Sequence, residues 1–350
     1  MSLLQLPPET LTQIFDDIGS SYFRSDLSRL TVCKQWSKFA HTACYRDSYF
    51  TQKTLKRLRS SPYTDSSLSL VKDSMETLDL NLNDIEGCDS IRLLSSKLRV
   101  MNDPVVPLAI CSDWRRDLND DLSYFATIIE QSRKLRILRI QANNELHLAY
   151  CFQMHNNYLF SPTLRGFLST SNLTSLELDI CGTELVPYQF QEHSEGLHVC
   201  TSIAVPLTTL RRLRLRMRSI CSDVLKPRQN NTNLRLNEVL INLSLFNSPP
   251  LTTLAVHATC CDLSPGGIVQ LKGEMEKQAQ LLVTHMAAPK IVRILTHALP
   301  SFRKQAFDVL TGKVIKLSKG AEWDDDGEAM EDDISEEESD ISSLSSYGDL

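Results

Sequence analysis

A row of arginines between residues 211 and 218 is the part of the chain best suited to binding a charged ligand. In this segment arginine alternates with leucine or methionine. Successive side chains of a β-strand point to opposite faces, so we expect Arg212, Arg214 and Arg216 to share one face. Arginine binds carboxylates and phosphates through paired, charge-assisted hydrogen bonds. These three arginines, with Arg139 of a similar segment, are therefore predicted to bind an acidic or phosphorylated segment of a protein substrate.

The same arginines could instead pair with acids of their own chain. Glu177 and Asp179 occupy comparable positions in another apolar segment, and the C-terminal region is strongly acidic. A solvated or internally paired row is therefore the alternative to a binding site. Nucleic acid is not expected as a partner, because the positive excess is modest and no row of aromatic residues accompanies the arginines.

The histidines and cysteines show no spacing typical of a catalytic or metal site. His193 and His198 stand five residues apart, and the ten cysteines form no Cys-x-x-Cys pair. The chain also has no phosphate-binding glycine loop and no nucleophile elbow. The adjacent Cys260 and Cys261 leave two interpretations open, a redox pair or buried thiols at the end of a strand. We therefore expect no enzymatic activity, no cofactor and no metal.

A recurring apolar pattern, L-x-x-L-x-L, marks the segments that should position the arginines. Its full copies begin at Met75, Leu135, Leu173, Leu210 and Leu251, and a weaker copy begins at Leu98. The last four full copies start 38, 37 and 41 residues apart. Apolar residues at helical spacing lie between them, in 119–129, 161–168 and 236–243. Strands and helices that alternate at a near-constant interval are typical of repeat proteins.

This pattern resembles degenerate leucine-rich repeats and predicts an irregular α/β solenoid with parallel strands over residues 75–262. A generic α/β domain with several buried parallel strands is the alternative. Residues 60–67 are rich in turn-forming residues and predict a linker, which we place at 51–74. Helical spacing of apolar residues over 263–320 predicts a C-terminal helical cap.

Residues 6–36 predict a small all-α unit of three helices. Pro7 and Pro8 suit the first turn of a helix, and Leu11, Ile14 and Phe15 recur along one face of it. A second short segment and a third helix ending the unit follow from similar spacing. A unit of less than about 70 residues rarely holds together by its own core alone. We therefore expect residues 1–50 to dock on a partner.

The unit resembles the F-box, by which F-box proteins bind the Skp-family adaptor of a cullin–RING ubiquitin ligase. The family's Leu-Pro-x-Glu opening matches residues 6–9, and its Val-Cys-Lys-x-Trp close matches 32–36. Thr10 replaces the usual second leucine, and the resemblance covers only the first 45 of 350 residues. It implies a set of residues that contact the adaptor or hold the helices that do. They are Leu6, Pro7, Leu11, Ile14, Phe15, Leu27, Leu30, Val32, Cys33 and Trp36.

Charge is distributed unevenly along the chain. Residues 321–350 carry thirteen acids and no Lys or Arg, a charge of −13, whereas the whole chain carries −6 and the remainder therefore +7. Like charges in a block repel each other and stay solvated, so the sequence predicts a disordered acidic tail over 321–350. No apolar run is long enough to cross a membrane, and scattered cysteines suit a reducing compartment, so we expect the cytoplasm or the nucleus and no membrane partner.

Together these features predict the substrate-recognition subunit of a Skp–cullin–F-box ubiquitin ligase. The F-box would bind the adaptor and the solenoid would bind a protein target, so that the partners supply the chemistry. The alternative is a non-catalytic interaction scaffold that uses the same adaptor outside ubiquitin transfer.

Overall fold

The computed structural model describes most of the chain. The described residues are 5–60, 64–83, 105–142, 158–186, 198–228, 233–246, 257–261, 266–298, 303–318 and 320–329. Within these residues no helix is both long and apolar enough to cross a membrane. The weak repeat copy at Leu98 and the full copy at Leu251 lie outside the described residues.

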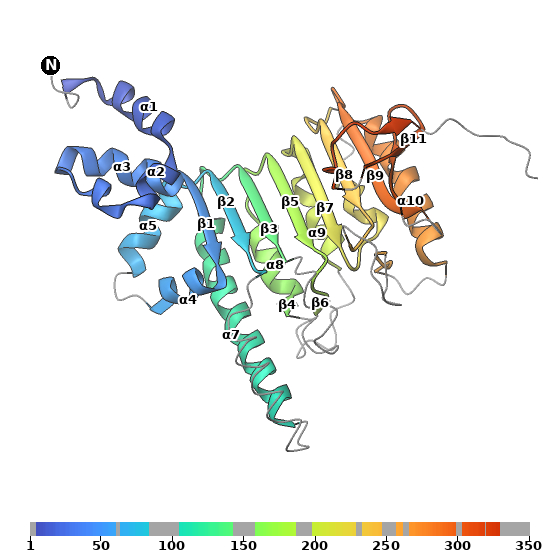
Figure 1. The fold of residues 1–350 in the computed structure, drawn as a ribbon, viewed down its shortest axis with the longest axis horizontal. Helices are drawn as coiled ribbons and strands as arrows, with labels where there is room; N and C mark the ends of the chain where they lie inside the picture. The colour runs from blue at the N-terminus through green and yellow to red at the C-terminus, as the bar shows by residue number, and fades with distance from the viewer. Residues whose placement is uncertain are drawn as a thin grey trace, which may run out of the picture.

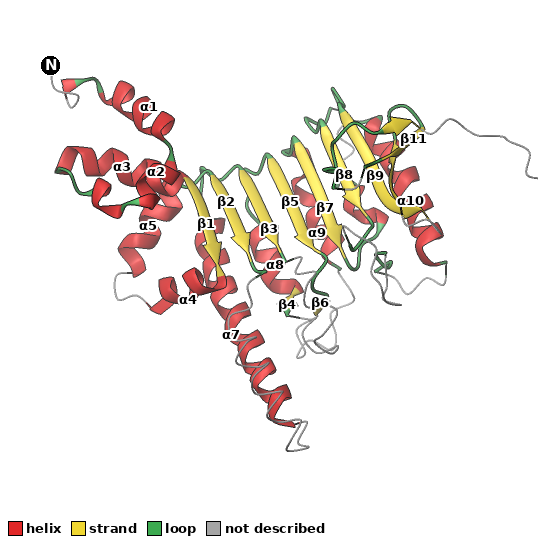
Figure 2. Cartoon of the chain, viewed as in Figure 1, coloured by secondary structure: helices red, strands yellow, loops and turns green. Residues whose placement is uncertain are grey.

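Helices and strands alternate along the chain (Figures 1 and 2). The α-helices are α1 (Pro8–Ile18), α2 (Ser20–Ser25), α3 (Lys34–Arg46), α4 (Gln52–Ser60), α5 (Thr64–Ser74), α7 (Val105–Glu130), α8 (Ser161–Leu168), α9 (Val199–Ile203) and α10 (Gly267–Val283). Short 3-10 helices are η2 (Leu27–Leu30), η3 (Val205–Thr208) and η4 (Ser222–Leu225). The strands are β1 (Asp47–Thr51), β2 (Thr77–Asn81), β3 (Ile137–Gln141), β4 (Leu159–Phe160), β5 (Ser175–Ile180), β6 (Leu185–Val186), β7 (Arg212–Met217), β8 (Glu238–Asn242), β9 (Ile291–Ala298), β10 (Arg303–Asp308), β11 (Lys313–Lys316) and β12 (Glu328–Ala329).

One ten-stranded sheet organises the molecule. Its order is β1-β2-β3-β5-β7-β8-β9-β10-β11-β12, so each strand lies beside the strands nearest to it in the sequence. Strands β1 to β9 are parallel, because long crossovers connect them, and β9 to β12 are antiparallel. A separate pair, β4 and β6, is also parallel.

The two faces of the sheet differ sharply in polarity. Leu78, Leu138, Leu176, Leu213 and Val239 align across five neighbouring strands. All five are buried against the helices in the main hydrophobic core. The residues next to them along each strand point to the opposite face and are mostly charged, which is the alternation expected of a sheet with one apolar face.

Helices behind the sheet supply the other half of this core. On α7, Leu118, Leu122, Phe125 and Ile129 recur at helical spacing and are buried. Helix α8 begins with a proline in its first turn, where the missing N–H is not needed. In Figure 1 the helices α7, α8, α9 and α10 lie on one side of the sheet.

The N-terminal helices have a small core of their own. Phe15 of α1, Phe23 of α2 and Leu30 of η2 pack against α3, with Trp36 at the edge of the cluster. Phe15 and Trp36 meet edge to face, with ring centroids 4.4 Å apart. These helices lie at one end of the sheet, beside β1 (Figure 1).

The predicted leucine-rich-repeat solenoid is wrong. The chain instead forms a mixed α/β domain on one flat, mostly parallel sheet, and the sheet extends into antiparallel strands that no repeat unit provides. The L-x-x-L-x-L pattern did mark real strands at β2, β3, β5 and β7. It reports a strand that buries one face, and a flat sheet satisfies that condition as well as a curved solenoid does.

The predicted helix at 236–243 and the helical cap at 263–320 are also wrong in large part. Residues 238–242 form β8, and the cap region contains one helix, α10, followed by β9, β10 and β11. Strands β8 and β9 are buried on both faces, so each contains a run of adjacent apolar residues, such as residues 239–241, without polar alternation. Such a run also contains residues at helical spacing, so periodicity alone misassigned it.

Two further boundaries differ from the prediction. The expected linker at 51–74 contains helices α4 and α5. The expected disordered tail is ordered at its beginning, because β12 pairs with β11 and Trp323 is buried. Residues 330–350 of the predicted tail lie outside the described residues.

Candidate functional site

A ladder of opposite charges crosses the polar face of the sheet. Asp79, Arg139, Glu177 and Arg214 are aligned partners on β2, β3, β5 and β7. The Arg139 guanidinium lies 3.2 Å from Asp79 and 3.6 Å from Glu177. Residues opposite each other on neighbouring strands are close enough to interact, so register alone places Arg139 between two acids and Arg214 between Glu177 and Leu240.

The guanidinium of Arg216 is paired with a carboxylate of its own chain. Its Nε and a terminal nitrogen donate to the two carboxylate oxygens of Asp179 at 2.8 and 2.7 Å. The side chain of Arg216 is 2% exposed. Of the four arginines predicted to bind a substrate, this one therefore serves the packing of β5 against β7.

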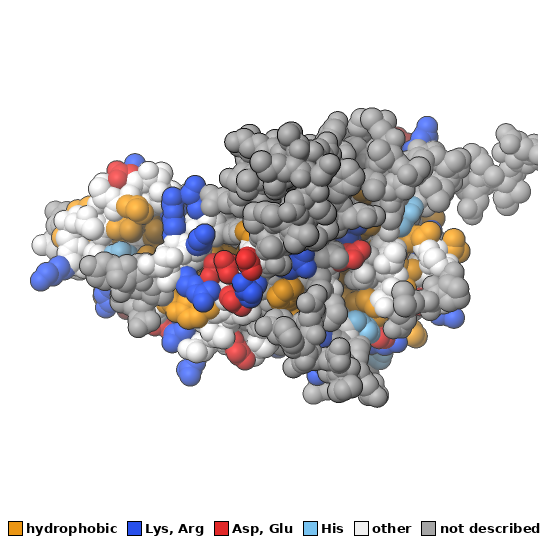
Figure 3. Space-filling view, turned by 90° about the horizontal axis from the view of Figure 1, so that it is seen from below, with side chains coloured by type: hydrophobic (Ala, Val, Ile, Leu, Met, Phe, Trp, Pro, Cys, Tyr) orange, Lys and Arg blue, Asp and Glu red, His pale blue; other side chains and the backbone are white. Residues whose placement is uncertain are grey.

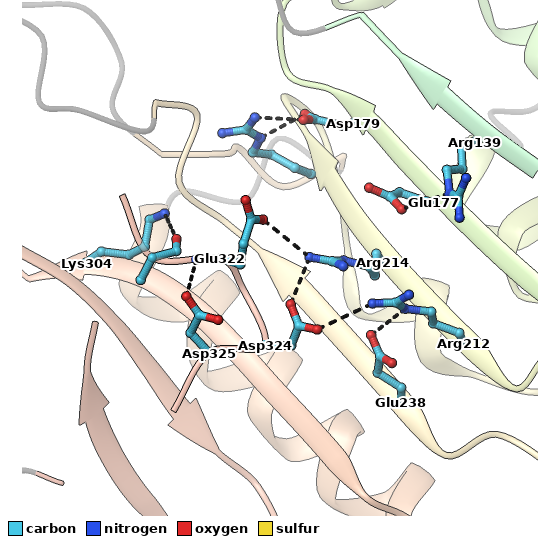
Figure 4. A network of polar contacts seen from close by, with 12 residues as sticks. Arg139, Glu177, Asp179, Arg212, Arg214, Glu238, Lys304, Glu322, Asp324 and Asp325 are labelled. Atoms are coloured by element: carbon cyan, nitrogen blue, oxygen red, sulfur yellow. Dashed lines mark hydrogen bonds and ion pairs between the residues drawn. The ribbon is translucent and has the colours of Figure 1, made fainter. Parts of the chain in front are cut away.

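The first residues of the acidic region cover the next two arginines. Asp324 accepts hydrogen bonds from Arg214 at 3.3 Å and from Arg212 at 3.5 Å (Figure 4). Arg212 also donates to Glu238 at 2.6 Å. We call residues 320–326 the acidic strap, because they cross the polar face over β7 and β8.

An aromatic ring holds the acidic strap in place. Trp323 packs with Leu240, Leu295 and Leu317 in a small apolar cluster on the polar side of the sheet. The guanidinium of Arg214 lies 5.3 Å from the centre of the Trp323 ring, within the range of a cation–π contact. The internal pairing of the arginines, left open by the sequence, is therefore what the structure describes.

The residues predicted to bind an adaptor divide into three groups by burial. Leu11, Phe15 and Leu30 are buried and hold the helices together, whereas Leu6, Ile14, Cys33 and Trp36 are half-buried. Pro7, Leu27 and Val32 are exposed. Leu27, the first residue of η2, is 63% exposed, and Val32, two residues beyond the end of η2, is 67% exposed. We call Pro7, Leu27 and Val32 the apolar docking residues.

A cluster of one histidine and three cysteines was missed from the sequence. The ligating atoms of His198, Cys200, Cys221 and Cys261 all lie within 4.8 Å of one another. No metal-binding spacing between nearby residues marks the cluster, because its members come from three separate segments of the chain. A longer-range signal existed: Cys221 and Cys261 are 40 residues apart, close to the interval between apolar repeats.

Comparison of the chain with protein-family models, with curated proteins and with solved structures gave no match. The F-box resemblance therefore depends on the residues of the N-terminal helices alone.

Proposed function

We propose that this protein is the substrate-recognition subunit of a cullin–RING ubiquitin ligase. Its N-terminal helices would bind a Skp-family adaptor, and the polar face of the sheet would receive a protein target. The observation that carries the proposal is the exposure of Leu27 and Val32 within the segment that resembles an F-box. Two large apolar side chains exposed within one short segment favour an interface with another protein.

The packing of the N-terminal helices supports this proposal. Phe15, Phe23 and Leu30 fill the small core and fix the helices relative to one another. This small core thus holds the helices in place, so the apolar docking residues lie on a preorganised surface. Preorganisation lowers the entropy lost on binding.

The polar face suits an acidic target. Arg139 and Arg212 remain about one-third exposed although each is paired with acids. An acidic target segment would take the place of Asp324 at Arg212 and Arg214 and would retain the same hydrogen bonds. Such an exchange costs little charge desolvation, because the arginines already lie in an acidic environment.

Adaptor binding is tested with the double variant Leu27→Asp, Val32→Asp and a purified Skp-family adaptor. Both side chains are exposed, so the variant should fold normally while affinity falls about 100-fold or more. The matched control is Val269→Asp, because Val269 is 81% exposed on α10, far along the sequence. Isothermal titration calorimetry measures both. Equal affinity of the double variant and the wild type would contradict adaptor binding at this surface.

A second experiment separates ubiquitin transfer from the scaffold alternative. The protein is purified with the adaptor and then offered a cullin–RING subunit. A complex that contains the cullin supports the ligase, whereas a stable complex with adaptor that never takes up cullin supports a scaffold outside ubiquitin transfer.

A further inference from the structure

His198, Cys200, Cys221 and Cys261 come from three segments that meet beside η4. His198 and Cys200 begin α9, Cys221 immediately precedes η4, and Cys261 ends the segment 257–261. Ser219 and Thr259 form a parallel bridge, so Cys221 and Cys261 each lie two residues beyond the same pair. The backbone pairing therefore fixes these two cysteines next to each other.

The distances within this cluster match the edges of a tetrahedral zinc site. With Zn–S bonds of about 2.3 Å and a Zn–N bond of about 2.0 Å, tetrahedral geometry places two sulfurs about 3.8 Å apart and sulfur and nitrogen about 3.6 Å apart. The sulfurs of Cys200 and Cys261 are 3.6 Å apart. The sulfur of Cys221 lies 3.6 Å from Nδ1 of His198. The packing of buried thiols alone gives no reason for the imidazole of His198 and the thiols of Cys200, Cys221 and Cys261 to converge on one point.

Histidine orientation provides a second, independent observation. Nε2 of His198 lies 3.3 Å from a carboxylate oxygen of Asp223. With Nε2 donating its proton to Asp223, Nδ1 is the nitrogen left to bind a metal; Nδ1 lies 3.6 Å and Nε2 3.8 Å from the Cys221 sulfur. Metal-ligating histidines are commonly oriented by such a carboxylate on the far nitrogen.

The electrostatics of the three thiols also favour a bound cation. The sulfur of Cys200 lies 3.6 Å from the sulfur of Cys261 and accepts the backbone N–H of Cys221 at 3.4 Å, so the three thiols share one partly buried site. Deprotonation of one of these thiols therefore disfavours deprotonation of a second, because like charges repel in a buried site. A divalent cation removes that conflict and stabilises all three thiolates.

We propose that His198, Cys200, Cys221 and Cys261 bind one structural zinc ion. Three thiolates and one imidazole form a Cys₃His set, which is typical of structural zinc. All four positions around the metal are then filled by protein, so the site holds α9, η4 and residues 257–261 together and leaves no position for a substrate. Cys200 and Cys221 are buried, which keeps water away from two of the thiolates.

Metal content tests this proposal directly. The full chain is produced in medium supplemented with zinc, and bound metal is measured by inductively coupled plasma mass spectrometry. We expect about one zinc ion per chain. Exchange with Co²⁺ should give the visible d–d bands of tetrahedral cobalt together with thiolate-to-metal charge transfer in the near ultraviolet. Octahedral cobalt spectra, or a metal content at background, would overturn the assignment.

Variants test which residues bind the metal. Cys221→Ser and Cys261→Ser should each lose the zinc, whereas the control Cys260→Ser should retain it, because Cys260 is adjacent in sequence but is not one of the four ligands. Asp223→Asn keeps all four ligands and should weaken zinc affinity by about 10- to 100-fold. Zinc lost from Cys260→Ser and retained by Cys261→Ser would refute the proposed ligand set.

The competing outcome is a redox site. Cys200 and Cys261 are close enough to form a disulfide after a small movement. Alkylation of the native protein followed by peptide mass spectrometry distinguishes the two. Zinc-protected thiols that become reactive only after a chelator is added support the metal site, whereas a disulfide between Cys200 and Cys261 in the freshly purified protein excludes it.

Discussion

Arg216 on β7 and Asp179 on β5 form a bidentate pair, with two parallel hydrogen bonds of 2.8 and 2.7 Å. Their Cα atoms are register partners, so the pair joins neighbouring strands at matching positions. Arginine and carboxylate geometries fit this arrangement, and burial strengthens each hydrogen bond. The pair therefore fixes the register of two central strands from the polar side of the sheet.

Removing only one partner should be strongly destabilising. We expect Arg216→Met to lower the free energy of unfolding by about 3–5 kcal/mol, because Asp179 is left buried without its counter-charge. The double variant Arg216→Met, Asp179→Leu should recover much of this loss. Arg116→Met is the control, since its ion pair with Asp113 is exposed on α7. Urea denaturation measures all three, and a loss below about 1 kcal/mol for Arg216→Met would contradict this role.

The acidic strap should open when Trp323 is removed. Trp323→Ala deletes the ring that packs on Leu240 and Leu295, so residues 320–326 should lose protection in hydrogen exchange while β7 keeps its own. Glu322→Gln is the control, because Glu322 is mostly exposed and lies 4.0 Å from Arg214. Unchanged exchange in the strap of Trp323→Ala would show that the ring does not anchor it.

Acid should destabilise the protein through His297. Burial, with the nearby His257, Lys304 and Arg216, lowers the pKa of His297 to about 4. Between about pH 6.5 and pH 4, His297 is therefore protonated in the unfolded chain but neutral in the folded chain. The free energy of unfolding then falls as the pH falls through this window. Above about pH 6.5 the residue is neutral in both states and contributes no pH dependence.

The size of this effect is bounded by the pKa difference. Each pKa unit corresponds to about 1.4 kcal/mol, so the loss is at most about 3.5 kcal/mol. Urea midpoints at about pH 7 and about pH 5 should differ more for the wild type than for His297→Gln. An equal difference in both proteins would assign the acid sensitivity to other groups.

Phe15 should control the stability of the N-terminal helices. The ring is buried against Phe23 and Trp36, so Phe15→Ala should cost about 3–5 kcal/mol in the unfolding of this unit. Leu27→Ala, at an exposed position, should cost less than about 1 kcal/mol. Helical circular dichroism and tryptophan fluorescence of Trp36 follow both. Similar losses in the two variants would contradict the division between core and docking residues.

Sequence patterns identified elements well where burial was one-sided. The alternation around Leu78, Leu138 and Leu176 correctly marked strands, because one face of each is polar. The pattern failed at Leu240 and Leu295, which pack beneath Trp323 on the second face of the sheet. No local pattern reveals that a distant segment covers a polar face, so these strands resembled helices.

The candidate sites show the same limit. Alternation correctly placed Arg212, Arg214 and Arg216 opposite the core, yet their partners Asp179 and Asp324 could be chosen only once the register was known. The histidine–cysteine cluster depended entirely on long-range pairing between Ser219 and Thr259. Residues that long-range pairing brings together show only a weak signal in their sequence spacing. Figure 3 shows acidic and basic side chains side by side in one cluster on the surface seen from below.

The sequential order of strands has a consequence for biosynthesis. The parallel strands of the main sheet (β1, β2, β3, β5, β7, β8 and β9) lie side by side in the order in which the ribosome makes them, so each new strand has its neighbour already synthesised. Residues 320–326 must instead return to β7, more than one hundred residues earlier, to meet Arg212. During translation, therefore, Arg212 and Arg214 lack their contacts with Asp324 until this late segment emerges.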